Sequence, residues 1–369
     1  MMIRNGHIAV LAAILMLLVS LASCRREEAV KDGCITISFS TGAFETKAGD
    51  GVVADGGGIA IDAGVPNIVV ALVDKLDNII AWYPSYFPDT DPSDPFTSEL
   101  IGDPSSTQNT IQISGPGRGT YTVYAVANYT GLSASALAAL KAATEKDDLE
   151  AIELVVSGTP AVPTFLNSRM PISAKGTLSV NVSGNGQVDL DLLRPVSLVE
   201  LYFIDQTDGD DPLVLYDCSV TIYEMNPTSG YLFVRDPDKG SGSFDDLEFE
   251  GSNLTLSTAP TTPTLGGTMV FPSTAPAQSL GNRYLCDISF NVKKSGAVAY
   301  DSGDSETYNA YSYTGLPIHD YRSTDLQYLR RNQRLKVSTR ITKRGSEHDV
   351  SFWFEVASWE ERTETVEFN

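Results

Sequence analysis

The sequence is poor in the residues from which most catalytic and metal sites are built. Only three histidines occur among its 369 residues, together with four cysteines and three tryptophans. The sequence therefore has too few histidines for a metal site made of several of them, and few for histidine-based catalysis. Basic residues are also scarce, since 26 Lys and Arg stand against 47 Asp and Glu and give a net charge of −21. A surface this acidic repels phosphate backbones and argues against nucleic-acid binding.

The common sequence signatures of catalysis are absent as well. The chain has no G-x-S-x-G nucleophile motif, no P-loop lysine, no H-E-x-x-H zinc motif and no C-x-x-C pair. Two acidic loops offer oxygen ligands for calcium, but neither has the twelve-residue spacing of an EF-hand. We interpret both as solvated turns and expect no metal and no cofactor. The loops carry Asp89, Asp91 and Asp94, and Asp205, Asp208, Asp210 and Asp211.

A long apolar run stands near the N-terminus. Arg4 precedes an almost unbroken apolar stretch from Ile8 to Leu21, which Ala22, Ser23 and Cys24 close. The stretch is shorter than the ~20 residues that span a bilayer, but it is typical of a signal peptide. Its end resembles a lipobox, the site at which bacterial lipoproteins are cleaved before a diacylated cysteine. An ordinary secretory signal with an incidental cysteine is the alternative. We predict a lipoprotein signal peptide at 1–23, lipid on Cys24 and a flexible tether at 24–33.

Most of the remaining chain alternates apolar and polar residues, which is the pattern of β-strands. Ile35, Ile37 and Phe39 alternate with threonine and serine. Residues 335–341 and 350–356 alternate around a Lys-Arg-Gly-Ser turn, which predicts a hairpin. Two further runs are apolar on both faces and suit central strands, namely Ile68–Val73 and Tyr121–Ala127.

One stretch departs from this pattern. Residues 133–155 are rich in Ala, Leu, Lys and Glu, with leucines at helical spacing, and Asp147 is a candidate N-cap. Strands do not alternate with crossover helices, which argues against a parallel α/β fold. The sequence predicts an all-β fold with a short helical insertion, arranged as two β-sandwich domains in tandem. We place the domains at 34–235, including the insertion at 133–155, and at 236–369.

Three cysteines remain once the signal peptide and Cys24 are set aside. Cys218 and Cys286 each lie on the apolar side of an alternating strand, and Cys34 opens the first strand. We interpret Cys218 and Cys286 as small buried hydrophobic residues. A disulfide between them is the alternative, and a cysteine nucleophile is the least favoured reading because no histidine is placed to activate it.

Several short segments follow one another in an order found in one bacterial family. The lipobox is followed by the strand around Ile35 and then by Phe44-Glu45-Thr46-Lys47-Ala48. Later come Gly119–Asn128, Arg169–Ser173, Leu193–Val196, Leu329–Gln333, Val356–Trp359 and an alternating strand at Thr363–Phe368. This order resembles the fimbrillin-type lipoproteins of the Bacteroidales, which are type V pilus subunits and major or minor fimbrial proteins.

The resemblance implies two transthyretin-like β-sandwich domains, no enzymatic activity, and export to the cell outer membrane as a surface lipoprotein. It also implies assembly into a fimbrium with other pilus subunits by β-strand donation, and adhesion to a host or bacterial surface receptor. In stalk subunits of the family a protease removes the first strand, and a neighbour's strand fills the groove. Here the removable strand contains Ile35, Ile37 and Phe39, the candidate cleavage site is Lys47, and the candidate donor strand contains Val366 and Phe368.

Several roles stay open at this point. A stalk subunit needs cleavage and a donated strand, a tip subunit needs only the acceptor groove, and an anchor keeps Cys24 and its lipid. Lys47 stands where the stalk pattern usually has arginine. The C-terminal strand could instead complete its own domain.

A surface lipoprotein that binds glycans is a different class, and it would use exposed aromatics such as Trp82, Tyr83 and Tyr86. Our main interpretation is a structural pilus subunit.

Overall fold

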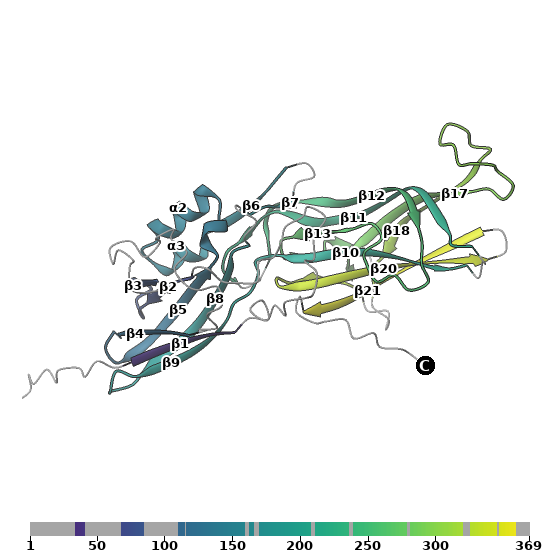
Figure 1. Cartoon of the computed structure of the whole chain (residues 1–369). Helices are drawn as coiled ribbons and strands as arrows, with labels where there is room; N and C mark the ends of the chain where they lie inside the picture. The colour runs from purple at the N-terminus through teal and green to yellow at the C-terminus, as the bar shows by residue number, and fades with distance from the viewer. Residues whose placement is uncertain are drawn as a thin grey trace, which may run out of the picture.

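The computed structural model describes residues 34–40, 68–84, 110–114, 116–158, 162–165, 170–207, 211–235, 239–278, 281–319, 325–344 and 347–358. The molecule is elongated, with one sheet at the N-terminal end and a second group of sheets at the other end (Figure 1). Strands make up most of the described residues, and the helices are short. The prediction of an all-β fold with a short helical insertion is confirmed.

Seven strands form the first sheet, in the order β3-β2-β5-β8-β9-β1-β4. β2 is buried on both faces, as its continuous apolar sequence predicts. Val70 and Leu72 of β2 share one core with Ile35 and Ile37 of β1. Three strands separate β2 from β1 in the sheet order, so the sheet curls into two layers around this core. Its strands are β1 (Cys34–Ser40), β2 (Ile68–Val73), β3 (Ile79–Pro84), β4 (Thr110–Ser114), β5 (Gly119–Ala127), β8 (Ile172–Val180) and β9 (Gly186–Asp191).

The sheet turns its corner between β8 and β9. In the described chain these strands pair at two positions, Ser179 with Gln187 and Val180 with Gly186, and then diverge. Gly176 of β8 lies against Leu190 of β9, and a Cβ atom at Gly176 would lie 2.4 Å from Leu190 Cδ2. Glycine permits this close approach because it has no side chain.

The helical insertion covers the outer face of the first sheet. Its elements are η2 (Tyr129–Gly131), α2 (Ala134–Ala142) and α3 (Lys146–Glu150). Ser133 caps α2 by accepting a hydrogen bond from the amide of Ala136. The expected cap of the second helix, Asp147, is wrong, because Glu145 and Asp148 form a capping box and Asp147 lies in the first turn. The last residues of 133–155 already belong to strand β6 (Glu153–Ser157).

The loop between α2 and α3 also protects an edge of the sheet. The amide of Ile79, in edge strand β3, donates to the carbonyl of Thr144, and the amide of Lys146 donates to the carbonyl of Asp77. An unpaired strand edge invites association with other chains. The insertion therefore closes one end of β3 with backbone hydrogen bonds.

Two sheets face each other at the other end and form the second sandwich. One has the order β13-β10-β20-β21, and the other β18-β17-β11-β6-β7, with β12 also paired to β11. Side chains such as Phe203 of β10, Ile222 of β11, Phe290 of β17 and Val337 of β20 form the core between them. The strands are β6, β7 (Val162–Pro163), β10 (Ser197–Gln206), β11 (Val214–Tyr231), β12 (Ser241–Thr255), β13 (Gly267–Val270), β17 (Leu285–Lys293), β18 (Tyr308–Pro317), β20 (Gln333–Arg344) and β21 (Glu347–Ser358), and the short pairs are β14 (Ser273–Thr274) with β19 (Tyr328–Leu329) and β15 (Ala277–Gln278) with β16 (Gly281–Asn282).

The predicted hairpin near the C-terminus is confirmed. β20 and β21 pair antiparallel from Gln333 with Ser358 to Arg344 with Glu347. β10 runs parallel to β20 on the other side, with Val199 opposite Leu335. β10 and β11 precede residue 235 in the sequence, yet they pair with strands that follow it.

The interpretation of Cys218 and Cys286 as buried residues is confirmed. Cys218 of β11 and Cys286 of β17 are free thiols, 2% and 0% exposed. Cys286 lies opposite Ile222, four residues along β11 from Cys218, so the two thiols do not pair. Burial raises the pKa of Cys218 to about 12, which keeps its thiol protonated and unreactive.

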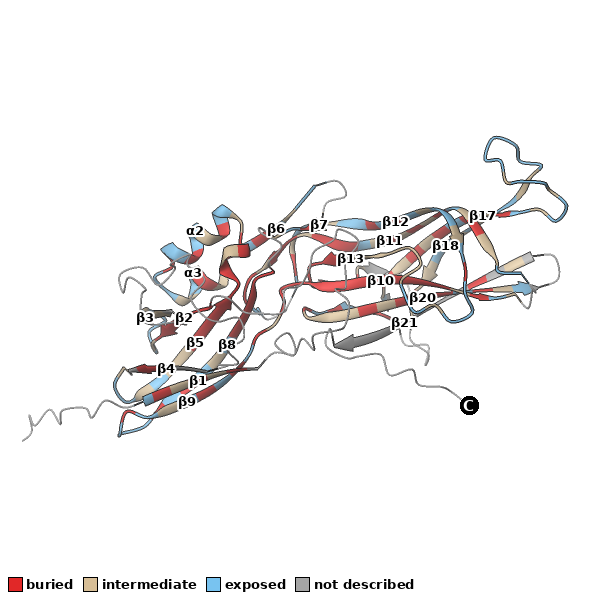
Figure 2. Ribbon diagram, in the orientation of Figure 1, coloured by how far each residue is buried: buried red, intermediate tan, exposed pale blue. Residues whose placement is uncertain are grey.

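A third core joins the first sheet to the second sandwich. Val69 and Tyr124 of the first sheet pack with Leu232, Phe233 and Phe271 from the other end. The rings of Tyr124 and Phe233 meet edge to face, with centroids 5.0 Å apart. Figure 2 shows buried residues along β5, β13 and β10, on both sides of this junction. The division into two transthyretin-like domains stays a prediction.

Candidate strand-acceptor site

β1 occupies an interior position of the first sheet although it is the first strand of the described chain. It pairs antiparallel with β4, where Ile35 lies opposite Ile113. On its other side it pairs parallel with β9, where Ile37 lies opposite Val188 and Phe39 opposite Leu190. Within the described chain, β4 has no other strand partner. Removal of β1 would therefore leave two rows of unpaired backbone groups facing one gap.

The inward face of β1 fills the core between the two layers. Ile35 and Ile37 are fully buried and Phe39 is 6% exposed, whereas Thr36 and Ser38 point outward. Burying three such side chains contributes about 5–9 kcal/mol, a large share of the ~5–15 kcal/mol by which a domain is stable. A groove without β1 would expose its apolar floor to water. That floor consists of Val70, Leu72, Val123, Leu178, Val188 and Leu190.

The end of the groove beside Cys34 is a preformed turn. The amide of Cys34 donates to Asn185 Oδ1 over 3.0 Å. Asn181 Oδ1 accepts hydrogen bonds from the amides of Ser183 and Asn185, which fixes the turn between β8 and β9. Gly184 has a φ of 77°, the left-handed conformation that favours glycine. The first residue of β1 is thus held by the side chain of Asn185, in the turn between β8 and β9.

Three solved structures are similar in fold to this chain over nearly their whole length. A candidate cell adhesion protein from Bacteroides eggerthii is 14% identical with a TM-score of 0.50, and 89% of this chain covers 96% of that one. A candidate cell adhesion protein from Parabacteroides distasonis is 11% identical with a TM-score of 0.51, at 89% and 97% coverage. A fimbrilin from Porphyromonas gingivalis is 8% identical with a TM-score of 0.50, at 89% and 98% coverage.

This chain has the fimbrilin fold. No protein-family model matches the sequence, and the search of curated proteins found no significant match. At these identities the likeness establishes the fold, so function has to be argued from the site. The expected resemblance to fimbrillin-type proteins is supported by structure over most of the chain.

Within the fimbrilin fold, the residues predicted to form the removable strand do form a strand, and its removal stays a prediction. Ile35, Ile37 and Phe39 line one face of β1 and enter one core. Cys24, Lys47, Val366 and Phe368 lie outside the described residues. The groove walls were not singled out in the sequence, although β4 and β9 both alternate apolar and polar residues. That period-two signal marks strands but does not tell which strands become neighbours.

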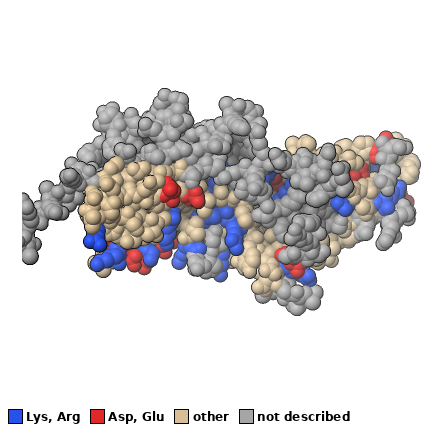
Figure 3. Space-filling model, turned by 90° about the horizontal axis from the view of Figure 1, so that it is seen from below, with Lys and Arg blue, Asp and Glu red and all other residues tan. Residues whose placement is uncertain are grey.

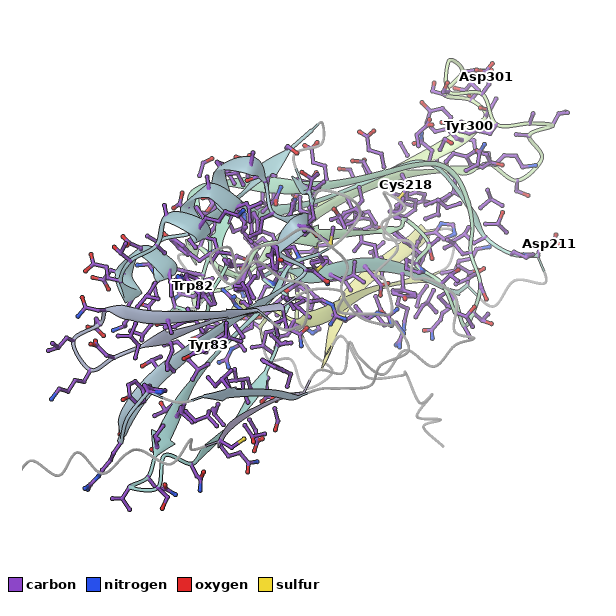
Figure 4. The ribbon with its side chains drawn as sticks, turned by 60° about the vertical axis from the view of Figure 1, so that its left-hand side comes forward. Trp82, Tyr83, Asp211, Cys218, Tyr300 and Asp301 are labelled. Carbon is purple, nitrogen blue, oxygen red and sulfur yellow. The ribbon has the colours of Figure 1, made fainter. Side chains whose placement is uncertain are left out.

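The two described aromatic residues proposed for glycan binding, Trp82 and Tyr83, do not share one face. Trp82 and Tyr83 are neighbours on edge strand β3 and point to opposite faces (Figure 4). Trp82 packs on the core beneath the helices, and Tyr83 packs on the core that contains β1. Tyr86 lies outside the described residues. Trp82 and Tyr83 therefore cannot stack side by side on one sugar face.

The acidic loop after β10 is organised by hydrogen bonds within the protein. Asp205 is buried and accepts bonds from the amide and hydroxyl of Thr207 and from the amide of Leu213. Burial would raise the pKa of Asp205, but these hydrogen bonds outweigh it and lower the pKa. Asp211 is exposed. The other predicted loop acids, Asp89, Asp91, Asp94, Asp208 and Asp210, lie outside the described residues.

Two further features are absent from the described residues. No group of three or more His, Cys, Asp and Glu side chains is placed to hold a metal ion there. Among the same residues, no helix has the length and apolar character needed to cross a membrane.

Proposed function

We propose that this protein is a non-enzymatic structural subunit of a cell-surface fimbria and contributes to adhesion. The single observation that carries the proposal is the place of β1, an N-terminal strand built into the interior of a sheet. The proteins of similar fold include a fimbrilin. A strand in this position is replaceable by a strand of another subunit, because the incoming strand restores both the backbone pairing and the apolar contacts.

The proposed route begins with export as a lipoprotein acylated on Cys24 and held at the outer membrane. Two or three acyl chains anchor a protein more firmly than one does. Cleavage after Lys47 then removes β1 together with the lipid. The donor is the strand Thr363–Phe368 of another subunit, whose Val366 and Phe368 alternate with polar residues as Ile37 and Phe39 do. Other pilus subunits are thus the partners, and a host or bacterial surface receptor is the target of adhesion.

A lipid-retained anchor is the alternative within the same fold. An anchor keeps Cys24 and β1, and its groove never opens. A glycan-binding lipoprotein has less support, because Trp82 and Tyr83 lie on opposite faces of β3.

The deciding experiment is mass spectrometry of the N-terminus of the protein sheared from its native cell. A start at Ala48 supports the subunit, and Lys47→Gln then abolishes that start while Lys75→Gln, a change in an exposed turn, leaves it unchanged. Acylated Cys24 as the sole species contradicts strand removal and supports the anchor. Saturable binding of a polysaccharide by the purified protein would instead support the glycan-binding lipoprotein.

A further inference from the structure

The C-terminal hairpin ends, at the last residue of β21, near the middle of the molecule. β21 ends at Ser358, which lies opposite Gln333 at the beginning of β20. The amide of Arg330 donates to Gln333 Oε1 over 2.9 Å, which closes the turn before β20. The next residue, Arg331, reaches back to the carbonyls of 231–233 at the junction with the first sheet. Figure 1 shows β21 running from the far end of the second sandwich back toward the first sheet.

The distance from Ser358 to a donated strand is short. Residues 359–362 separate Ser358 from Thr363, where the candidate donor strand begins. Five residue steps span at most about 18 Å when fully extended. β20 has twelve residues and is about 40 Å long, so the far end of the second sandwich is out of reach. A neighbour that accepts the strand must bring its groove alongside the junction.

Exposed apolar and basic residues lie near the junction. Tyr328 is 54% exposed and Val234 is 36% exposed, and both are among the large apolar residues that the described surface leaves open to water. Arg330 and Arg235 are exposed beside them in the sequence, and the guanidinium of Arg235 lies over the ring of Tyr231 at 4.2 Å. The two segments lie together because Arg331 donates hydrogen bonds to the carbonyls of 231–233. We call these four exposed residues the junction surface. Figure 3 shows Lys and Arg along the lower edge of this face, from the first sheet to the middle of the molecule.

The groove of the neighbour carries the opposite charge on its rim. β9 borders the groove, and its inward residues Val188 and Leu190 alternate with outward Asp189 and Asp191. Both aspartates are exposed. A strand inserted beside β9 therefore brings its own subunit close to two carboxylates. Opposite charges across an interface fix its register and speed its formation.

We propose that the junction surface binds the β9 face of a second copy of this chain, so that successive subunits overlap side by side at the junction. The inference rests on the proposed function, since it takes the strand Thr363–Phe368 as the donor. Aromatic and arginine side chains are the residues that most often dominate such interfaces. The linker is too short for Thr363 to reach from Ser358 to the far end of the second sandwich.

Charge-reversal variants of the full chain in its native cell test this contact. Arg235→Glu with Arg330→Glu, and separately Asp189→Lys with Asp191→Lys, should each reduce the polymer in the sheared fraction about tenfold, because like charges then face each other. The chain that carries all four changes should regain most of the polymer. Lys75→Glu, an equal change in charge in an exposed turn of the first sheet, should leave the polymer unchanged.

Cysteine cross-linking locates the contact independently of charge. A chain with Arg330→Cys and Asp191→Cys should form disulfide-linked ladders between copies, whereas Lys75→Cys with Asp191→Cys should not. The side-by-side contact is overturned if the subunits of the polymer start at Ala48, the charge reversals leave the amount of polymer unchanged, and the cysteine pair gives no ladder. Strand donation would stay intact in that case. Absence of any wild-type polymer overturns the proposed function and this inference together.

Discussion

The guanidinium of Arg331 donates a hydrogen bond to the carbonyl oxygen of Leu232, with Nη1 3.1 Å from the oxygen. The same oxygen accepts a bond from Ser173 Oγ on β8 of the first sheet. Nη2 of Arg331 also donates to the carbonyls of Tyr231 and Phe233. One buried side chain thus satisfies three carbonyls where β11 ends, and it ties the second sandwich to the first sheet.

Replacing Arg331 should weaken this junction. Arg331→Met leaves buried carbonyls without a donor, which should lower the free energy of unfolding by about 2–5 kcal/mol. Arg331→Lys should recover part of the loss, because an ammonium reaches fewer of these carbonyls than the planar guanidinium does. Urea denaturation measures both. The exposed neighbour Arg330 is the control, and Arg330→Met should change stability by no more than about 0.5 kcal/mol. Equal effects at 330 and 331 would contradict this role.

The two faces of β1 should respond differently to mutation. Ile37→Ala removes a fully buried side chain and should cost about 2–5 kcal/mol in the uncleaved protein. Ser38→Ala lies one residue further on the outward face and should cost no more than about 0.5 kcal/mol. Thermal and urea unfolding of the two variants make the comparison. If Ile37→Ala were as mild as Ser38→Ala, the inward face of β1 would not hold the layers together.

The sequence predicts strand identity well and strand partners poorly. The alternation in Ile35–Phe39 marks a strand with one buried face, and the structure bears this out. Alternation does not reveal that β1 lies parallel to β9, because β9 follows β1 by about 150 residues in the chain. Such long-range pairing depends on how the whole sheet curls, and a local sequence pattern does not predict it.

The cores shared between segments are equally hard to predict. Trp82 and Tyr83 form an aromatic pair in the sequence, but strand geometry sends them to different cores. Arg331 belongs to a segment that resembles the fimbrillins, yet nothing local shows that its partners are carbonyls 98 to 100 residues away. Asp147 fits the composition of a helix N-cap, and only the backbone shows that the helix begins at Lys146, after the cap residue Glu145.

The three cysteines should differ sharply in reactivity. Cys34 is exposed on β1, whereas Cys218 and Cys286 are buried. Burial raises the pKa of both buried thiols, that of Cys218 to about 12, so neither forms a thiolate at pH 8. In a chain with Cys24→Ser, a maleimide at pH 8 should label one thiol of the folded protein and three in urea. Mass spectrometry counts the labels, and a second label on the folded protein would show that a core thiol is accessible.

Acid should weaken the contact between α3 and the first sheet. Tyr124 Oη and Lys175 Nζ each donate to Glu150 Oε1 over 2.6 Å. Burial would raise the pKa of Glu150, but the bonds from Lys175 and Tyr124 outweigh it and lower the pKa below its ordinary value. A carboxylate with a lowered pKa stabilises the fold at neutral pH, and this contribution is lost as the pH falls through its folded pKa.

The matching experiment compares wild type with Glu150→Gln at several pH values. At pH 7 the variant should be less stable by about 1 kcal/mol, a modest figure because Lys175 is partly exposed. The difference should shrink as the pH falls below about 5, since the wild-type carboxyl group then becomes neutral like the amide. Glu248→Gln on the outward face of β12 is the control and should behave as wild type does. A gap between Glu150→Gln and wild type that stays unchanged down to the lowest pH at which both remain folded would mean that the shape of the side chain, and not its charge, holds α3 against the sheet.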